Sequence, residues 1–143
     1  MKKTLITLVL LAITSLLFSA DKTSTLTLTI ENISKANAPL RVGFYKKGAE
    51  FPEKGKATFS KVLIPKKTGR VSFKVEGVEH GEWAVAMYHD LNNNNEIEKN
   101  FFGVPEEPYG FYRNFKPKLS APDFEDCSFT FNGDKEIVVE LIE

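Results

Sequence analysis

Hydrophobic and polar residues alternate along most of the chain beyond residue 20. Leu26, Leu28 and Ile30 alternate with threonines, which is typical of a strand that buries one face. The same period of two predicts further strands over residues 40–45, 59–64, 71–76, 124–131 and 135–142, and the segment 59–64 also fits a short helix. Residues 83–88 (WAVAMY) are apolar on both faces, as expected of a central strand covered on both sides.

These strands predict an all-β fold. About seven short strands, separated by Gly, Pro and Asn, favour a β-sandwich of immunoglobulin or transthyretin type, and a closed barrel is the alternative. Between Leu91 and Pro122 the chain shows no clear periodicity, and loops of this length are usually functional or disordered. Because this long loop carries several aromatic residues, we expect it to fold over the sandwich.

The first twenty residues resemble a targeting segment. Lys2 and Lys3 precede a short apolar run, and Ala20 precedes the polar Asp21, which is the pattern of a secretory signal peptide. The run is shorter than the roughly 20 residues of a membrane span, and an uncleaved anchor is the alternative. We expect a signal peptide over 1–20 and a single β-sandwich domain over 21–143, in the periplasm or outside the cell.

The composition limits the classes of partner. With 19 basic and 19 acidic residues, the chain lacks the basic excess that neutralises nucleic-acid phosphates. Its hydrophobic content of 42% is too high for a disordered chain. The single cysteine, Cys127, excludes an intramolecular disulfide, and its strand parity places it inward on one face with Phe129 and Phe131. We expect no nucleic-acid partner and no membrane span after signal cleavage.

One motif with recognisable chemistry directly follows the predicted central strand. Asp90, Asn92 and Asn94 present side-chain oxygens at alternate positions, which is the 1, 3, 5 spacing of calcium loops. The Glu96 carbonyl falls at loop position 7 and the Glu98 side chain at position 9. Calcium prefers six to eight such oxygen ligands, so the sequence predicts a weak Ca²⁺ site here.

Two features of the EF-hand loop are missing. Position 6 is Asn95 rather than Gly, although Asn tolerates the left-handed conformation. Position 12 is Phe101, so no bidentate Glu stands there, and Glu106 or Glu107 is a more distant source of a carboxylate. The alternative is an Asn-rich turn that is held by side-chain-to-backbone hydrogen bonds without a metal.

The same region resembles a known family. From Gly81 through Asn114, and again near Pro122, the sequence is similar to the bacterial secreted family with domain of unknown function 2141. The matching residues are Gly81, Trp83, Ala84, Val85, His89, Asp90, Asn92, Asn94, Ile97, Asn100, Gly103, Val104, Pro105, Glu107, Tyr109, Gly110, Phe111, Pro122, Phe124 and Asp126. The sequence departs from the family pattern at Asn95, Glu98, Pro108 and Tyr112. The resemblance implies an exported all-β domain without an assigned activity.

Little in the sequence points to catalysis. His89 is favoured as a core or loop-orienting histidine over a catalytic one, since a general base needs a second group at a defined position. Glu106 and Glu107 are adjacent, whereas a glycosidase needs two carboxyls across a cleft. We predict that the protein is not an enzyme. The alternative is a small-ligand-handling or hydrolytic domain that uses His89 with Asp90 or Glu107.

The long loop also carries an aromatic group, namely Tyr109, Phe111, Tyr112 and Phe115. Such side chains are enriched at binding surfaces, where they contact protein, peptide or glycan partners. Their other role, which we favour, is to pin the loop onto the sandwich. The sequence therefore predicts an exported, non-enzymatic module with a binding or structural role and a calcium-stabilised loop.

The targeting segment generates the first prediction. The exported protein is expected to begin at Asp21, because the charged start, the short apolar run and Ala20 together form a signal for cleavage. N-terminal sequencing of protein recovered from outside the cytoplasm tests this expectation. Recovery of a chain that still begins at Met1 would rule out cleavage and favour the anchor.

Overall fold

The computed structural model describes residues 22–143, so the predicted signal peptide over 1–20 lies outside the described residues. The described chain folds into eight strands, β1 (Thr23–Ile33), β2 (Leu40–Lys46), β3 (Phe59–Leu63), β4 (Gly69–Glu79), β5 (Gly81–His89), β6 (Tyr109–Phe111), β7 (Ser128–Phe131) and β8 (Lys135–Glu140). Two short 3-10 helices, η1 (Tyr112–Asn114) and η2 (Phe124–Cys127), complete the secondary structure.

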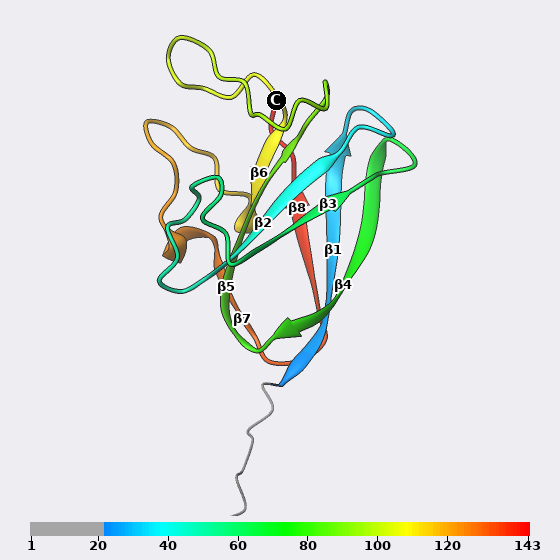
Figure 1. The fold of residues 1–143 in the computed structure, drawn as a ribbon, viewed down its shortest axis with the longest axis vertical. Helices are drawn as coiled ribbons and strands as arrows, with labels where there is room; N and C mark the ends of the chain where they lie inside the picture. Colours follow the sequence, from blue (N-terminus) through cyan, green and yellow to red (C-terminus); the bar gives the residue numbers. More distant parts are fainter. Residues whose placement is uncertain (1–21) are drawn as a thin grey trace, which may run out of the picture.

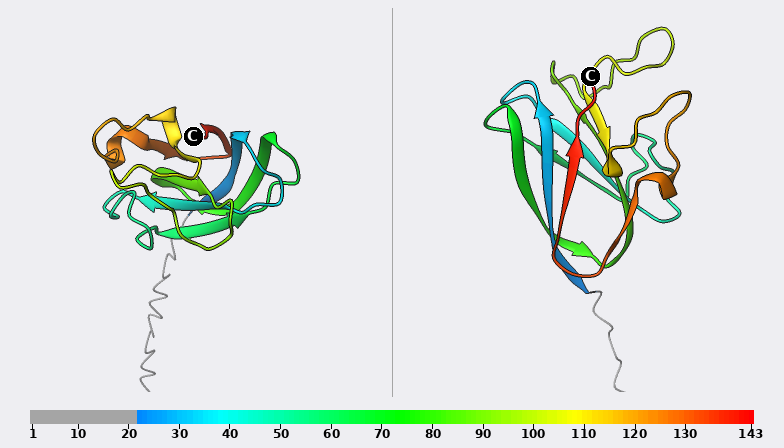
Figure 2. Two further views of the ribbon diagram at one scale, coloured as in Figure 1. Left: turned by 90° about the horizontal axis from the view of Figure 1, so that it is seen from above. Right: turned by 180° about the vertical axis from the view of Figure 1, so that it is seen from behind.

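The strands form two sheets that pack face to face (Figure 1). The smaller sheet has the order β4-β1-β8, in which β1 pairs antiparallel with β4 and parallel with β8. The larger sheet has the order β3-β2-β5-β6, and β7 also pairs with β5. Seen from behind, β4, β1 and β8 lie in front of the larger sheet (Figure 2). The prediction of an all-β sandwich is confirmed.

The main core lies between the two sheets. It is built from the inward positions of the alternating strands, so that Leu26, Leu28 and Ile30 of β1 are fully buried against the larger sheet. Trp83 on β5 is 2% exposed, and its ring packs edge-on against Phe59 with centroids 5.4 Å apart. The segment predicted over 59–64 forms strand β3, which pairs with β2, and its first residue, Phe59, packs against the core.

A second apolar cluster lies on the other face of β5, as the apolar pattern of residues 83–88 predicts. It contains buried Ala84, Phe111 and Cys127, with further aromatic side chains packed around them. The expectation that Cys127 shares a face with Phe129 and Phe131 is wrong. Cys127 ends helix η2 instead of continuing a strand, because Asp123 and Asp126 form a capping box that stabilises this helical turn.

The long loop contains a strand that the pattern did not reveal. β6 has three residues and pairs with Ala86, Met87 and Tyr88 of β5. Its central residue, Gly110, faces β8 so closely that a Cβ there would come within 2.8 Å of Val139 Cγ1. A glycine at this point therefore lets the loop pack onto the sandwich. Within residues 22–143, no helix has the length and apolar character needed to cross a membrane.

Trp83 provides a test of the core. Trp83→Ala is expected to lower the free energy of unfolding by about 3–5 kcal/mol, because it removes a large buried ring and leaves a cavity. It also removes the hydrogen bond from Trp83 Nε1 to the Glu79 carbonyl, which measures 2.8 Å. Urea melts of both proteins measure the difference. A loss of less than about 1 kcal/mol would contradict a central role for this residue.

Candidate functional site

The loop after β5 begins at a buried carboxylate. Asp90 is fully buried, and its Oδ2 accepts hydrogen bonds from Arg41 Nε at 2.5 Å and from the Asn95 amide at 3.0 Å. Its Oδ1 accepts the Asn94 amide at 3.1 Å. Arg41 lies on β2 whereas both amides belong to the loop. Asp90 therefore fastens the first turn of the loop to the neighbouring strand.

The asparagines shape this turn through bonds to the backbone. Asn92 Oδ1 accepts the Asn94 amide at 3.1 Å, and Asn94 Oδ1 accepts the Glu96 amide at 2.9 Å. Asn95 has a φ of 64°, so it adopts the left-handed conformation that Asn tolerates at loop position 6. The Nδ2 groups of Asn92 and Asn94 both donate to Glu98 Oε1, at 2.8 Å for Asn92, so that hydrogen bonds join Asn92, Asn94 and Glu98.

A small hairpin brings two glutamates together. The Glu106 amide donates to the Glu98 carbonyl at 2.8 Å, and Lys99 pairs with Pro105, so the chain reverses over 98–106. Glu107 follows the returning arm, and the charge of the nearby Glu98 carboxylate contributes to its raised pKa. Glu107 is 6% exposed, and its Oε1 accepts the Leu91 amide at 2.8 Å. The hairpin therefore adds a third carboxylate to the site.

Unpartnered polar atoms gather at this end of the sheet. Within residues 22–143, the buried side-chain nitrogen and oxygen atoms that lack a hydrogen-bond partner are Tyr88 Oη, His89 Nδ1, His89 Nε2, Glu98 Oε2 and Glu107 Oε2. Each such atom costs about 1–3 kcal/mol if nothing satisfies it. An ion or an ordered water is the usual partner of such atoms, and Glu98 and Glu107 contribute one oxygen each.

The pKa values of the three carboxyl groups at the site are shifted in different directions. Burial raises the pKa of Asp90, but the bonds from Arg41 and the Asn95 amide outweigh burial and keep that pKa below its usual value. Hydrogen bonds from the Asn92 side chain, and then from other groups, lower the pKa of Glu98. Burial raises the pKa of Glu107, and the nearby Glu98 carboxylate raises it further. Of these three carboxyl groups, Glu107 is the one whose pKa is raised.

The donor set fits a hard cation that takes mixed oxygen ligands. Among the described residues, no group of three or more His, Cys, Asp or Glu side chains is arranged to hold a metal ion. A cation site here must therefore combine the carboxylates with the amide oxygens of Asn92 and Asn94 and the Glu96 carbonyl. Calcium accepts this mixture, whereas zinc prefers nitrogen and sulfur ligands.

Two basic residues of the site were not found from the sequence. Arg41 also donates through Nη2 to Asn93 Oδ1 at 3.1 Å, and Lys54 Nζ lies 3.2 Å from Glu96 Oε2 and contacts the Asn95 carbonyl. Both come from segments far from the loop along the chain. Their contacts with the loop depend on strand register and loop packing, which cannot be predicted from the local sequence.

His89 lies apart from the carboxylates. It follows Met87 on the inner face of β5, is fully buried, and forms no hydrogen bond to Asp90 or Glu107 among the described residues. Successive side chains of a strand point to opposite faces, so Tyr88 rather than His89 faces the side of Arg41. The arrangement that the hydrolytic alternative requires is not present in the described geometry.

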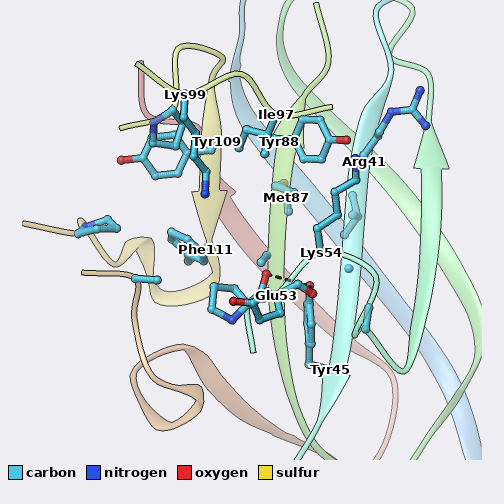
Figure 3. A pocket seen from close by; sticks show the side chains of 18 of the residues that line it. Arg41, Tyr45, Glu53, Lys54, Met87, Tyr88, Ile97, Lys99, Tyr109 and Phe111 are labelled. Carbon is cyan, nitrogen blue, oxygen red and sulfur yellow. Dashed lines mark hydrogen bonds between the residues drawn. The ribbon is translucent and has the colours of Figure 1, made fainter. Parts of the chain in front are cut away.

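The four predicted surface aromatics divide between two environments. Tyr109 and Phe111 lie on the outer face of the larger sheet with ring centroids 5.9 Å apart, and Phe115 packs onto the same outer cluster. Tyr112 turns the other way and packs against Phe129 of the main core at 4.9 Å. The four residues therefore pin the loop to the sheet, and only Tyr109 and Phe111 line a hollow (Figure 3).

The fold and this loop define an all-β sandwich module with an acidic, Asn-rich loop at the end of its central strand. The family described as "Uncharacterized protein conserved in bacteria (DUF2141)" matches residues 28–139. The match covers most of the chain, so the protein belongs to the bacterial DUF2141 family, as the resemblance predicted. No curated protein and no solved structure gives a significant match to the chain.

His89 generates a pH prediction. Burial lowers the pKa of His89, so below about pH 6.5 the unfolded chain binds a proton that the folded chain excludes. As the pH decreases below about 6.5, the free energy of unfolding should decrease, and this histidine contributes at most about 1.4 kcal/mol per pH unit to the decrease. The His89→Leu variant should not show this part of the decrease in the free energy of unfolding.

Urea melts of the wild type and of His89→Leu between pH 7.5 and pH 5 measure it. Parallel profiles for the two proteins would show that His89 already takes up its proton in the folded state, contrary to the expectation.

Proposed function

We propose that the protein is an exported, non-enzymatic binding module whose loop over residues 90–107 is stabilised by one bound Ca²⁺. The ligands are side-chain oxygens of Asp90, Asn92, Asn94, Glu98 and Glu107, together with the Glu96 carbonyl. Glu107 completes the set that the sequence motif begins. The observation that carries the proposal is the pair of buried, unpartnered oxygens, Glu98 Oε2 and Glu107 Oε2.

The charge at the site favours a divalent cation over an empty turn. Arg41 pairs with Asp90 and Lys54 pairs with Glu96, whereas Glu98 and Glu107 form no ion pair among the described residues. Two carboxyl groups in close contact cannot both be ionised without a large penalty, so Glu98 and Glu107 share either a proton or a cation. At neutral pH, calcium removes this conflict, because it replaces the proton and satisfies both oxygens.

The expected affinity is that of an extracellular module. The EF-hand's bidentate Glu at position 12 is absent, and two ligands are neutral amides, so we expect a Kd of about 10⁻⁴–10⁻³ M. Millimolar calcium outside the cytoplasm would still occupy such a site. The signal peptide predicted over residues 1–20 supports this location.

The non-enzymatic role is supported by the placement of the reactive groups. His89 is enclosed on the inner face of the sheet, and burial raises the pKa of Cys127 to about 12, which suppresses its thiolate. Neither group meets a carboxylate in a hollow. The cation therefore has a structural role in the proposal: it fixes the hairpin over 98–106 relative to the sheet.

Thermal unfolding tests the calcium site. With calcium at ten times Kd, the folded state should gain about 1.4 kcal/mol over protein in EDTA, which raises the Tm by roughly 5 °C. Glu107→Gln should lose this gain, because its side chain keeps the bond to the Leu91 amide but loses its charge. Glu106→Gln is the matched control, since Glu106 is the exposed neighbour and should respond to calcium like the wild type.

The pH dependence separates a bound cation from a general salt effect. Calcium must displace the proton of Glu107, whose pKa is raised, so the calcium-dependent gain should be larger at pH 8 than at pH 5. Equal melting temperatures in calcium and in EDTA at pH 8 would refute the proposal and leave an Asn-rich turn without metal.

A further inference from the structure

A groove runs along the outer face of the larger sheet, opposite to the main core (Figure 3). It has a volume of about 870 Å³, which lies within the range of small-molecule sites. Strands β2, β5 and β6 form its floor, and its walls come from residues 52–57 and 117–121 and from Asn95, Ile97, Lys99 and residues 102–105 of the loop after β5. None of the six residues proposed as calcium ligands lines it, but Arg41 and Lys54 line it and contact that loop, so the groove adjoins the proposed calcium site.

The Tyr45 ring covers part of the floor of the groove. Gly43 and Ala86 are register partners on β2 and β5, and both line the groove. The Tyr45 ring lies against Gly43, where an added Cβ would come within 2.7 Å of Tyr45 Cε2. The Tyr45 hydroxyl then donates to the carbonyls of Pro52 and Glu53, at 3.2 and 3.0 Å. This anchor holds the wall over 52–57 in place.

Apolar side chains from separate segments stand exposed around the mouth of the groove. Phe102 is 85% exposed, Leu119 is fully exposed, and Val62 is 56% exposed. All three line the groove, and Tyr109 and Phe111 line it closer to the sheet. Exposed apolar side chains that converge on one hollow mark a binding site, since a ligand with an apolar body would remove them from water.

The charges along the groove are mostly positive. The lining contains five cations and one acid, namely Arg41, Lys54, Lys61, Lys99, Lys118 and Glu53. Arg41 and Lys54 are paired with carboxylates of the calcium loop, but Lys99 and Lys118 form no ion pair among the described residues. Lys99 lies beside Tyr109 and extends into the hollow (Figure 3). Lys99 and Lys118 stand on different segments of the lining, and each offers an anionic group in the groove an ammonium group without an ion-pair partner within residues 22–143.

We infer that the groove binds an anionic amphiphile, as a single molecule with an apolar chain and one carboxylate head. The apolar floor and mouth take the chain, and Lys99 and Lys118 take the head. The enclosure by three walls favours a free molecule over a flat membrane surface. This inference rests on the proposed binding role and gives that role a ligand class, but it does not depend on calcium.

Calorimetric titration with dodecanoate, below its micellar concentration, tests the inference. One dodecanoate should bind per chain, and dodecyltrimethylammonium, which has the same chain with a positive head, should bind at least tenfold more weakly. Ala86→Phe should weaken dodecanoate binding at least tenfold, because its ring fills the floor. Val138→Phe places the same ring on the outer face of the smaller sheet and should bind like the wild type.

The charge contribution has its own pair of variants. Lys99→Gln combined with Lys118→Gln should weaken dodecanoate binding severalfold and leave dodecanol binding unchanged. Lys66→Gln combined with Lys67→Gln removes the same charge away from the groove and should change neither. Thermal melts confirm that each variant is folded.

Several results would overturn the inference: no dodecanoate binding, equal binding by Ala86→Phe, or equal affinity for the cationic amphiphile. Binding to anionic phosphatidylglycerol vesicles without binding to free dodecanoate would assign the exposed apolar side chains to a membrane instead and would also overturn it. The titrations are run in EDTA, because calcium precipitates dodecanoate. Binding in EDTA supports the groove whatever calcium does to the Tm, so the two proposals fail separately.

Discussion

The functional end of this sandwich depends on one buried carboxylate. Asp90 leaves the central strand fully buried, and it is held there by Arg41 of β2 and by two amides of the loop that it begins. An unpaired charge at such a place would cost several kcal/mol, so the buried position of Asp90 depends on Arg41 and on the two amides of the turn. The ion pair between Asp90 and Arg41 adds little net stability, but it fixes the position of the turn relative to β2. The positions of the later ligands, including Glu98, follow from that first turn.

The central strand explains the positions of the two proposed sites. β5 is covered on its inner face by the main core and on its outer face by a second cluster built from the long loop. The loop must therefore return to the sheet, and it does so through β6, where Gly110 permits close contact with β8. This return places Glu107 against Glu98 and raises the walls of the groove. The return of the loop through β6 therefore determines both the conformation of the loop and the shape of the groove.

The sequence predicted those parts of the structure that are local. Alternation identified the long strands, and the spacing of Asp90, Asn92 and Asn94 identified the loop. The alternation of hydrophobic and polar residues did not reveal β6, because a strand of three residues is too short to show a period of two. It also did not reveal η2, because a capping box forms a helical turn where the pattern predicts a strand. The partnership of Asp90 with Arg41 and the groove itself arise from pairing between distant segments. No local pattern carries that information.

The proposed calcium site requires a cation, rather than a proton, between Glu98 and Glu107. A crystal structure of the protein grown in millimolar calcium at pH 8 distinguishes the two. One ion is expected, bound by Glu98 Oε2, Glu107 Oε2 and further loop oxygens at distances of about 2.3–2.6 Å. A direct contact of about 2.5–2.7 Å between the two carboxyl groups, with no ion near them, would show a shared proton and contradict it.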